Sequence, residues 1–376
     1  MRPNQSKFVF ANQLRGIAAI LVVMTHYFGT FFAEQAQLAE KTFSPNLNLV
    51  KGWWVHIFEL PYQGPFGVAI FFLISGFVIP FSLEKLSLPG FLVNRVLRIF
   101  PTYICCLALG TLAIWASAHY WGQPFRYDAT VLGANALLAH NYMGLPSMDA
   151  VNWTLSIEIK FYLIAALGAA AFFRRNPVWL LAFLAAAVAA TWRWSHGEPM
   201  APYYTTVFME LNYIVFMLAG CMFYQHAAGL ISTRALQVRT VLIVAVFSLT
   251  WSMGPQQDQF PDVTRWYYCA FAVFSLCYAL RERFKPRRLL DFLADISYPL
   301  YCVHPLVGYC LLKVLMDQGW RYGFAMMVAF PTALLLALLV HMTIENGSNA
   351  LGRSWGEALS QKKKTLRAVP AGSVGQ

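Results

Sequence analysis

The chain has 376 residues, of which 58% are hydrophobic and 12% are charged. Soluble domains carry about 25% charged residues, so this composition excludes an ordinary water-soluble enzyme. The 12 Trp, 18 Tyr and 30 Phe residues exclude a disordered chain, which would be poor in aromatic side chains. We therefore predict an all-α, polytopic integral membrane protein. At about 20 apolar residues per span, the length allows about ten transmembrane helices.

Apolar runs follow one another along the chain, and we expect each run to form a helix. They cover residues 14–32, 66–83, 101–121, 153–173, 178–194, 206–226, 240–253, 265–280, 294–316 and 322–344. Residues 130–145 form a possible half-helix. This pattern predicts one transmembrane domain over residues 1–345, followed by a basic, flexible cytoplasmic tail over residues 346–376.

The net charge of +11 comes from lysines and arginines that gather in alternate loops. One set of loops contains Lys85, Arg95, Arg98, Arg174, Arg175, Arg234, Arg239, Arg281, Arg283, Lys285, Arg287 and Arg288, and the other set contains Lys41, Lys51, Arg126, Arg193, Arg265 and Arg321. Because Lys and Arg accumulate in cytoplasmic loops, the first set and both termini are predicted to be cytoplasmic. The charge therefore indicates membrane topology, and we expect no nucleic-acid partner.

Two ionisable residues occupy the first predicted helix. Arg15 and His26 are eleven residues apart, close to three helical turns, so they share a face and lie about 16 Å apart along the axis. Ionisable groups inside a span are costly and usually face a polar cavity. Because a free imidazole titrates near neutral pH, His26 is a candidate general base. The alternative is a histidine that only hydrogen-bonds a neighbouring helix.

The fourth predicted helix carries Glu158 and Tyr162, which are four residues apart and share a face. A buried carboxylate needs a partner, for which His26, Arg15 or another arginine are candidates. Lys160 points away from this face and is free to reach the membrane surface or to pair elsewhere. Glu158 is therefore either part of an active site or half of an ion pair that fixes the helix bundle.

Arg95 and Arg98 are three residues apart, so both lie on one face of a helix that enters the membrane from the predicted cytoplasmic side. Two guanidinium groups on one face suit a phosphate-bearing ligand, which each can grip with two hydrogen bonds. The alternative interpretation is an anchor for lipid headgroups.

A late polar stripe is formed by Ser297, Tyr301 and His304, whose spacings of four and three place them on one helix face. Two prolines in the same segment interrupt its backbone hydrogen bonds, which is tolerated where a helix lines a cavity. We expect these three residues, together with Tyr162, to contact substrate.

Other polar positions carry weaker predictions. His341 and Glu345 are four residues apart at the end of the last run and are placed to pair. Five further histidines are predicted to lie at the surface or the membrane interface: His56, His119, His140, His196 and His226. Neither a metal spacing such as HExxH nor a Gly-rich phosphate loop nor a GxSxG segment is present, so we expect no metal and no tightly bound cofactor.

Five segments resemble, in the same order, the motifs of the membrane acyltransferase family 3. They are LRGIAA at residues 14–19 continuing to His26, FFLISGF at 71–77, RVLRIFP at 95–101, WTLSIEIKFY at 153–162 and SYPLYCVH at 297–304. Each motif alone is weak, but five in order make the resemblance specific. It covers nearly the whole chain.

The resemblance implies an enzyme of the plasma membrane, the inner membrane in bacteria. Members of this family move an acyl group, usually acetyl, from cytoplasmic acyl-CoA as co-substrate to a hydroxyl, commonly of a sugar in a surface or secreted polysaccharide. Carried over to this chain, His26 is the catalytic histidine, Arg15 its supporting arginine, and Arg95 and Arg98 the donor-side pair. Glu158 belongs to the active site.

A mechanism follows from these roles. A hydroxyl is a poor nucleophile at neutral pH, so His26 would take its proton, with Glu158 orienting the imidazole. Arg15 or Tyr162 would donate hydrogen bonds to the oxyanion of the thioester. The alternative function is a transporter or flippase for a lipid-linked sugar or small solute, which would use the same intramembrane charges to bind its substrate.

Two positions depart from the family pattern. Asn12 stands where the family often has Asp, so no carboxylate is available there. The last run ends in Glu345-Asn346-Gly347, which lacks the proline of the Glu-x-Pro segment found in many members. This departure weakens the case for a catalytic role of Glu345 and leaves its role open.

Overall fold

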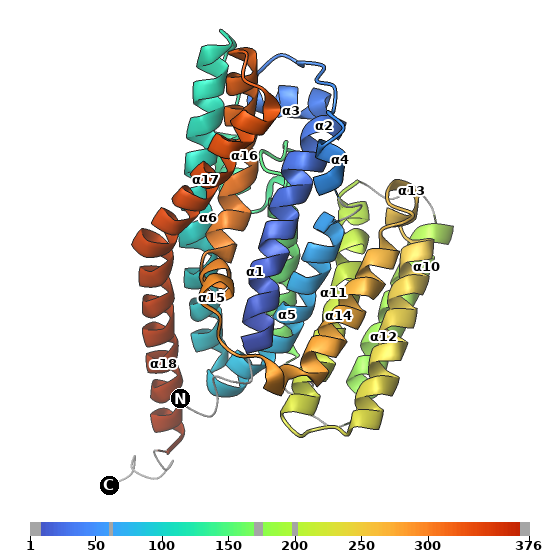
Figure 1. The fold of residues 1–376 in the computed structure, drawn as a ribbon. Coiled ribbons are helices and arrows are strands. Elements are labelled where there is room, and N and C mark those ends of the chain that lie inside the picture. The colour runs from blue at the N-terminus through green and yellow to red at the C-terminus, as the bar shows by residue number, and fades with distance from the viewer. Residues whose placement is uncertain (1–8, 60–62, 169–175, 198–201, 369–376) are drawn as a thin grey trace.

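In the computed structural model, every predicted apolar run forms a helix (Figure 1). The structure describes residues 9–59, 63–168, 176–197 and 202–368, and within them it contains helices and no strands. The predicted all-α fold class is therefore confirmed.

The helices follow one another in chain order, with short helices of three to eight residues between the long ones. They are α1 (Val9–Met24), the π-helix η2 (Thr25–Thr30), α2 (Phe31–Ala33), α3 (Gln35–Thr42), α4 (Val55–Phe58), α5 (Gln63–Lys85), α6 (Leu88–Tyr120), α7 (Ala129–Ala136), the 3₁₀-helix η3 (His140–Met143), α8 (Asn152–Leu167), α10 (Val178–His196), α11 (Pro202–Ala227), α12 (Thr233–Met253), α13 (Gln256–Gln259), α14 (Thr264–Ala279), the 3₁₀-helix η4 (Arg281–Arg283), α15 (Arg288–Asp295), α16 (Ser297–Asp317), α17 (Tyr322–Val340), the π-helix η5 (His341–Glu345) and α18 (Asn346–Ala368).

Eight helical segments in the described part of the chain are long and apolar enough to cross a membrane, and they contain α1, α5, α6, α10, α11, α12, α16 and α17. Helices α8 and α14 have 16 residues each. At 1.5 Å per residue that is about 24 Å, shorter than the hydrocarbon core of about 30 Å. The end of the predicted run 153–173 lies outside the described residues. The chain is a multi-pass membrane protein, but the predicted count of ten spans is not confirmed.

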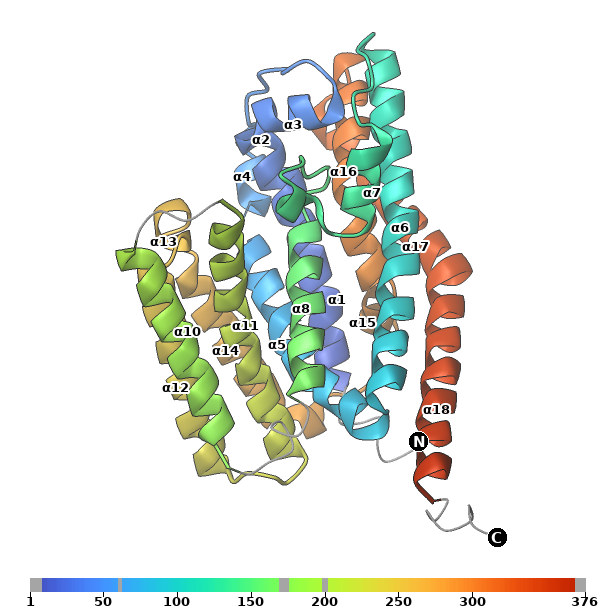
Figure 2. The same cartoon turned by 180° about the vertical axis from the view of Figure 1, so that it is seen from behind.

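The two ends of the bundle differ in charge. Helix α1 begins and α18 ends at one end, which also holds the α5–α6 and α11–α12 connections (Figures 1 and 2). We call it the basic end because Lys85 ends α5, Arg234 lies in the first turn of α12, and Arg281, Arg283 and Lys285 follow α14. Helices α2, α3, α4 and α13 lie at the opposite end. The basic end is the side that the loop charges predict to be cytoplasmic.

Helix α5 lies at the centre of the bundle, in contact with α1, α8, α11 and α14. It meets α11 backbone to backbone: a Cβ on Gly76 would lie 2.0 Å from the Met217 carbonyl oxygen, and one on Gly220 would lie 2.3 Å from that of Leu73. Small residues allow such contacts between membrane helices. This close packing fixes the position of α5 along α11.

Within the segment predicted to be a flexible tail, helix α18 continues through Ala368, and residues 369–376 lie outside the described part of the chain. Helix α18 packs along α6. A Cβ on Gly356 would lie 2.8 Å from the Gly90 carbonyl oxygen, and the Ser87 amide donates to Ser360 Oγ at 2.8 Å. The polar composition of this segment suggested flexibility, whereas its small residues at four-residue spacing form a face that another helix can approach closely.

Candidate active site

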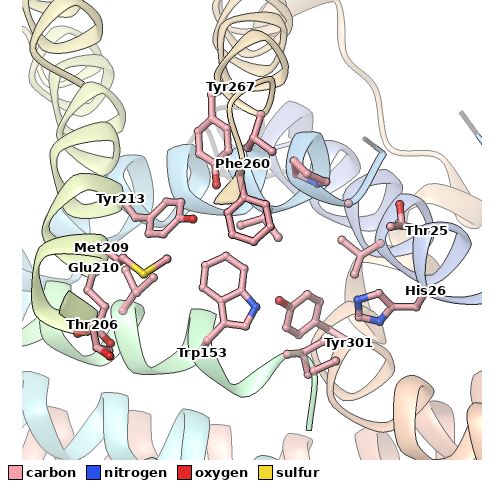
Figure 3. A pocket seen from close by; sticks show the side chains of 18 of the residues that line it. Thr25, His26, Trp153, Thr206, Met209, Glu210, Tyr213, Phe260, Tyr267 and Tyr301 are labelled. Carbon is pink, nitrogen blue, oxygen red and sulfur yellow. The ribbon is translucent and has the colours of Figure 1, made fainter. Parts of the chain in front are cut away.

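Two cavities in the described part of the bundle, one nearer each end, are lined by the residues predicted to be functional. The basic cavity, of about 540 Å³, is lined by residues that include Arg15, Ser75, Lys85, Arg95, Arg98, Glu158, Tyr162, Ser297, His341 and Glu345. The aromatic cavity, of about 440 Å³, is lined by residues that include Thr25, His26, Trp153, Glu210, Tyr213, Phe260 and Tyr267 (Figure 3). The residues predicted to be functional are therefore divided between these two cavities.

A thin layer separates the two cavities. Val68 and Tyr301 line both of them. Thr154 lies at the same level and its Oγ1 is 2.8 Å from the Tyr301 hydroxyl. Because the Thr154 hydroxyl also donates to the Val151 carbonyl oxygen, Tyr301 is the donor to Thr154. We call Val68, Thr154 and Tyr301 the partition.

His26 is paired with His304 at this level. It lies in the π-helical turn η2, a feature frequent at functional sites. His304 Nδ1 is 2.8 Å from the Leu300 carbonyl oxygen and must donate to it. His304 Nε2 is then an acceptor, and His26 Nδ1 donates to it at 2.9 Å. This chain of hydrogen bonds leaves the lone pair of His26 on Nε2, so the ring can accept a proton there.

Glu158 does not contact His26. Its Oε1 accepts hydrogen bonds from Ser75 Oγ at 2.8 Å and from the Tyr162 hydroxyl at 2.6 Å. Glu158 lines the basic cavity, whereas His26 lines the aromatic one. The predicted orientation of His26 by Glu158 is absent from the structure, and His304 occupies that position. Ser75, which belongs to the FFLISGF segment, is a hydrogen-bond partner of the carboxylate.

Arg95 and Arg98 both line the basic cavity, as their spacing predicted, but they differ in burial and in hydrogen bonding. Arg95 is buried, and its Nη2 donates to Ser82 Oγ at 2.9 Å and to Asn94 Oδ1 at 3.0 Å. Its guanidinium also lies 5.6 Å from the Tyr162 ring. Arg98 is partly exposed to the cavity. Arg95 is therefore held in place, and Arg98 is the more accessible cation.

Arg15 lies in the basic cavity, away from His26. Its Nη2 donates to the Ala294 carbonyl oxygen at 3.1 Å, and its buried Nε has no partner among the described residues. Helix α1 touches α15 at this point, because a Cβ on Gly16 would lie 2.8 Å from the Ala294 amide nitrogen. Arg15 and His26 share a helix face, but Arg15 lines the basic cavity and His26 lines the aromatic cavity.

The predicted substrate-contacting residues have separate places. Ser297 lines the basic cavity and its Oγ donates to the Ala294 carbonyl oxygen at 2.7 Å. Tyr301 belongs to the partition, and His304 is fully buried behind His26. Tyr162 donates to Glu158. Of these four residues, only Tyr301 lines both cavities.

The predicted pair of His341 and Glu345 is confirmed, with Nδ1 and Oε2 2.7 Å apart in the π-helical turn η5. Both residues line the basic cavity. Lys85 and Asp295 also line it, although the sequence singled out neither as a site residue. The only signal for Lys85 was its place in the charge count.

Two buried titratable residues lie near the opposite end, between α7 and α8. His140 was predicted to be at the surface, but it is fully buried, and burial lowers its pKa to about 4. Asp149 is 3% exposed, and burial raises its pKa to about 7 although two backbone N–H groups oppose the shift. Both shifts favour the neutral form of the side chain.

Asp149→Asn is expected to remove the part of the pH dependence of stability that comes from Asp149. Because the native pKa of Asp149 lies above the unfolded value of 3.8, its contribution is full below pH 3.8 and is lost as pH rises to about 7. The variant should therefore gain stability relative to wild type across this range, by about 1.4 kcal/mol per unit of pKa difference. Titration of His140 changes stability in the opposite direction. It does so equally in wild type and variant, so it does not contribute to the difference between them. Thermal unfolding in detergent between pH 4 and 8 measures the difference, and a pH-independent offset would contradict the prediction.

The fold and these cavities define a multi-pass helical membrane protein with a hydrogen-bonded histidine pair at the wall of the aromatic cavity. The chain belongs to the acyltransferase 3 family, whose model, described as an acyltransferase domain, matches residues 8–345. It is therefore a membrane acyltransferase.

Two relatives show the same likeness. Nodulation protein 10 of Rhizobium leguminosarum bv. viciae is 27% identical over 346 residues, covering 81% of this chain and 87% of the relative. Acyltransferase MdmB of Streptomyces mycarofaciens is 28% identical over 198 residues, covering 50% of this chain and 46% of the relative. No solved structure matches the chain.

Proposed function

We propose that the protein is an O-acyltransferase of the bacterial inner membrane. It moves an acetyl group from cytoplasmic acyl-CoA to a hydroxyl of a sugar, as part of a cell-surface or secreted polysaccharide. Both termini and the basic end face the cytoplasm. The observation that carries the proposal is the pair of cavities that meet at one partition beside His26, because a donor from one side and an acceptor from the other can react there.

The donor occupies the basic cavity in this proposal. Acyl-CoA carries several phosphate charges, and Arg98 and Lys85 present cations at the end where it arrives. Arg95, held by Ser82 and Asn94, adds a fixed positive charge behind them. The narrow pantetheine arm then extends toward Tyr301, which must move aside for the thioester to reach His26.

Acyl transfer follows from the histidine pair. His26 Nε2 takes the proton of the acceptor hydroxyl as its oxygen attacks the thioester carbon. His304 Nε2 stabilises the resulting imidazolium by accepting from His26 Nδ1. The Tyr301 hydroxyl, which donates to Thr154 at rest, is placed to donate to the oxyanion instead. The C–S bond then breaks, and His26 returns the proton to the departing CoA thiolate.

Consumption of acyl-CoA distinguishes this function from transport of a lipid-linked sugar or solute. Purified protein in proteoliposomes should release CoA from radiolabelled acetyl-CoA and place the label on the acceptor. The name of the relative MdmB, an acyltransferase, supports transfer over transport. Movement of a sugar across the membrane without loss of the thioester would contradict the proposal.

Arg98→Ala is expected to weaken acyl-CoA binding about tenfold or more, because a hydrogen bond to a charged group is worth about 1.5–3 kcal/mol. Arg98→Lys should restore only part of the affinity, since it keeps the charge but loses the planar fork. Titration of purified protein with CoA measures the effect. Arg353→Ala, which removes an exposed arginine of α18, is the matched control.

If Arg98 instead anchors the protein to lipid headgroups, the result differs. The variant would then insert poorly into the membrane, and the protein that does insert would bind CoA as tightly as wild type. Arg95→Ala is the less informative change, because Arg95 is buried and its loss also removes packing and hydrogen bonds.

A further inference from the structure

Glu210 of α11 is the one carboxylate among the residues that line the aromatic cavity in the described structure. Its Oε1 accepts from Lys160 Nζ at 2.7 Å and from Ser156 Oγ at 3.1 Å. Its Oε2 accepts from the Tyr142 hydroxyl at 2.8 Å. A carboxylate offers about four acceptor positions, so one position on Oε2 remains open for a ligand.

Trp153 supplies an apolar surface in the same cavity. Figure 3 shows its indole between His26 on one side and Glu210 on the other. Tyr213 packs against it, with the ring centroids 5.3 Å apart. Pockets of this kind bind ligands through aromatic faces, while a few polar groups fix the orientation of the ligand.

We propose that Trp153 and Glu210 form an acceptor subsite for a cyclic polyhydroxyl compound of the pyranose type. The ring stacks on the indole, a second hydroxyl donates to Glu210 Oε2, and the reacting hydroxyl thereby meets His26 Nε2. Glu210 thus determines which hydroxyl is acylated. This inference rests on the proposed function, since it places the acceptor in the aromatic cavity.

This arrangement requires an acceptor ring with at least two hydroxyl groups. A site that hydrogen-bonds a substrate hydroxyl strongly disfavours an analogue that lacks it, because its own polar group is left unpaired. A ring with a single hydroxyl can reach His26 or Glu210, but not both at once. It should therefore be a poor acceptor even though it fits the apolar walls.

The test uses protein in proteoliposomes with radiolabelled acetyl-CoA. The acceptors are methyl glucoside, methyl galactoside, methyl mannoside and methyl N-acetylglucosaminide, with cyclohexanol as the ring that has one hydroxyl. We expect wild type to acylate at least one pyranoside mainly at one position and to leave cyclohexanol unmodified. Glu210→Gln should raise the KM of the pyranoside roughly tenfold to a hundredfold and mix the positions acylated.

The KM of acetyl-CoA should stay unchanged in Glu210→Gln, which also shows that the variant is folded. Glu40→Gln is the matched control, because it removes an exposed carboxylate of α3 at the same end of the bundle. Trp153→Phe, which keeps an aromatic face, should retain more pyranoside transfer than Trp153→Leu. This second pair keeps the test valid if Glu210→Gln fails to accumulate.

Several results would overturn the subsite. They are acylation of cyclohexanol as efficient as that of pyranosides, an unchanged pyranoside KM and position in Glu210→Gln, and a cellular acyl product without a polyhydroxyl ring. In the first two cases acetyl is still transferred to a sugar hydroxyl, so the proposed function stands, whereas in the third the acyltransferase activity stands and the sugar acceptor is wrong. If wild type releases no CoA with any acceptor and cells contain no acylated product, the proposed function itself fails.

Discussion

His26→Asn is expected to lower acyl transfer roughly 10²–10⁴-fold, the contribution of one positioned base. An amide at this position can still hydrogen-bond His304, but it cannot take the proton of the acceptor hydroxyl. The protein should therefore insert and accumulate normally and lose only its chemistry. Release of CoA from acetyl-CoA in the presence of acceptor measures the effect.

A histidine that served only as a structural hydrogen-bonding group would behave differently, because the amide would preserve much of the activity. Transfer within a few-fold of wild type in His26→Asn would remove His26 from the mechanism. His196→Asn provides the matched control, since His196 is exposed at the end of α10 and lines neither of the two cavities.

His304→Leu is expected to cost on the order of 10²-fold or more in kcat, because the group that fixes the tautomer of the base is lost. His304 touches neither cavity and acts through His26, so it is a positioning residue. The KM values of donor and acceptor should stay near wild type. His304→Gln, whose amide oxygen can still accept from His26 Nδ1, should recover part of the loss.

The comparison of His304→Gln with His304→Leu separates positioning from packing. If His304 only fills space, both variants should lose similar activity and should also accumulate poorly. Equal kcat in the two variants, at normal protein levels, would contradict the role of the His304 acceptor.

Composition and helical spacing predicted the membrane class, the helices and which candidate residues share a helix face. Spacing along one helix fixes a face and a height, but it leaves open which distant helix lies opposite. His26 and His304 are 278 residues apart, and no local pattern pairs them. For the same reason, the sequence suggested Glu158 as the partner of His26, whereas Glu158 binds Ser75 on a neighbouring helix.

The far wall of the aromatic cavity was also missed. Glu210, Tyr213 and Tyr267 lie on α11 and α14, within apolar runs that matched no motif. The one usable signal was Lys160, a charge in a span that needed a partner and that pairs with Glu210 at 2.7 Å. The partner that Lys160 requires is the carboxylate of Glu210 on α11.

Mass spectrometry of surface glycans and secreted metabolites from cells that carry wild type or His26→Asn tests the central claim most directly. We predict an acetyl-sized mass on a sugar in wild-type cells and its loss in cells with the variant at equal protein levels. Identical spectra from the two strains, with the acetylated product present in both, would contradict catalysis by His26.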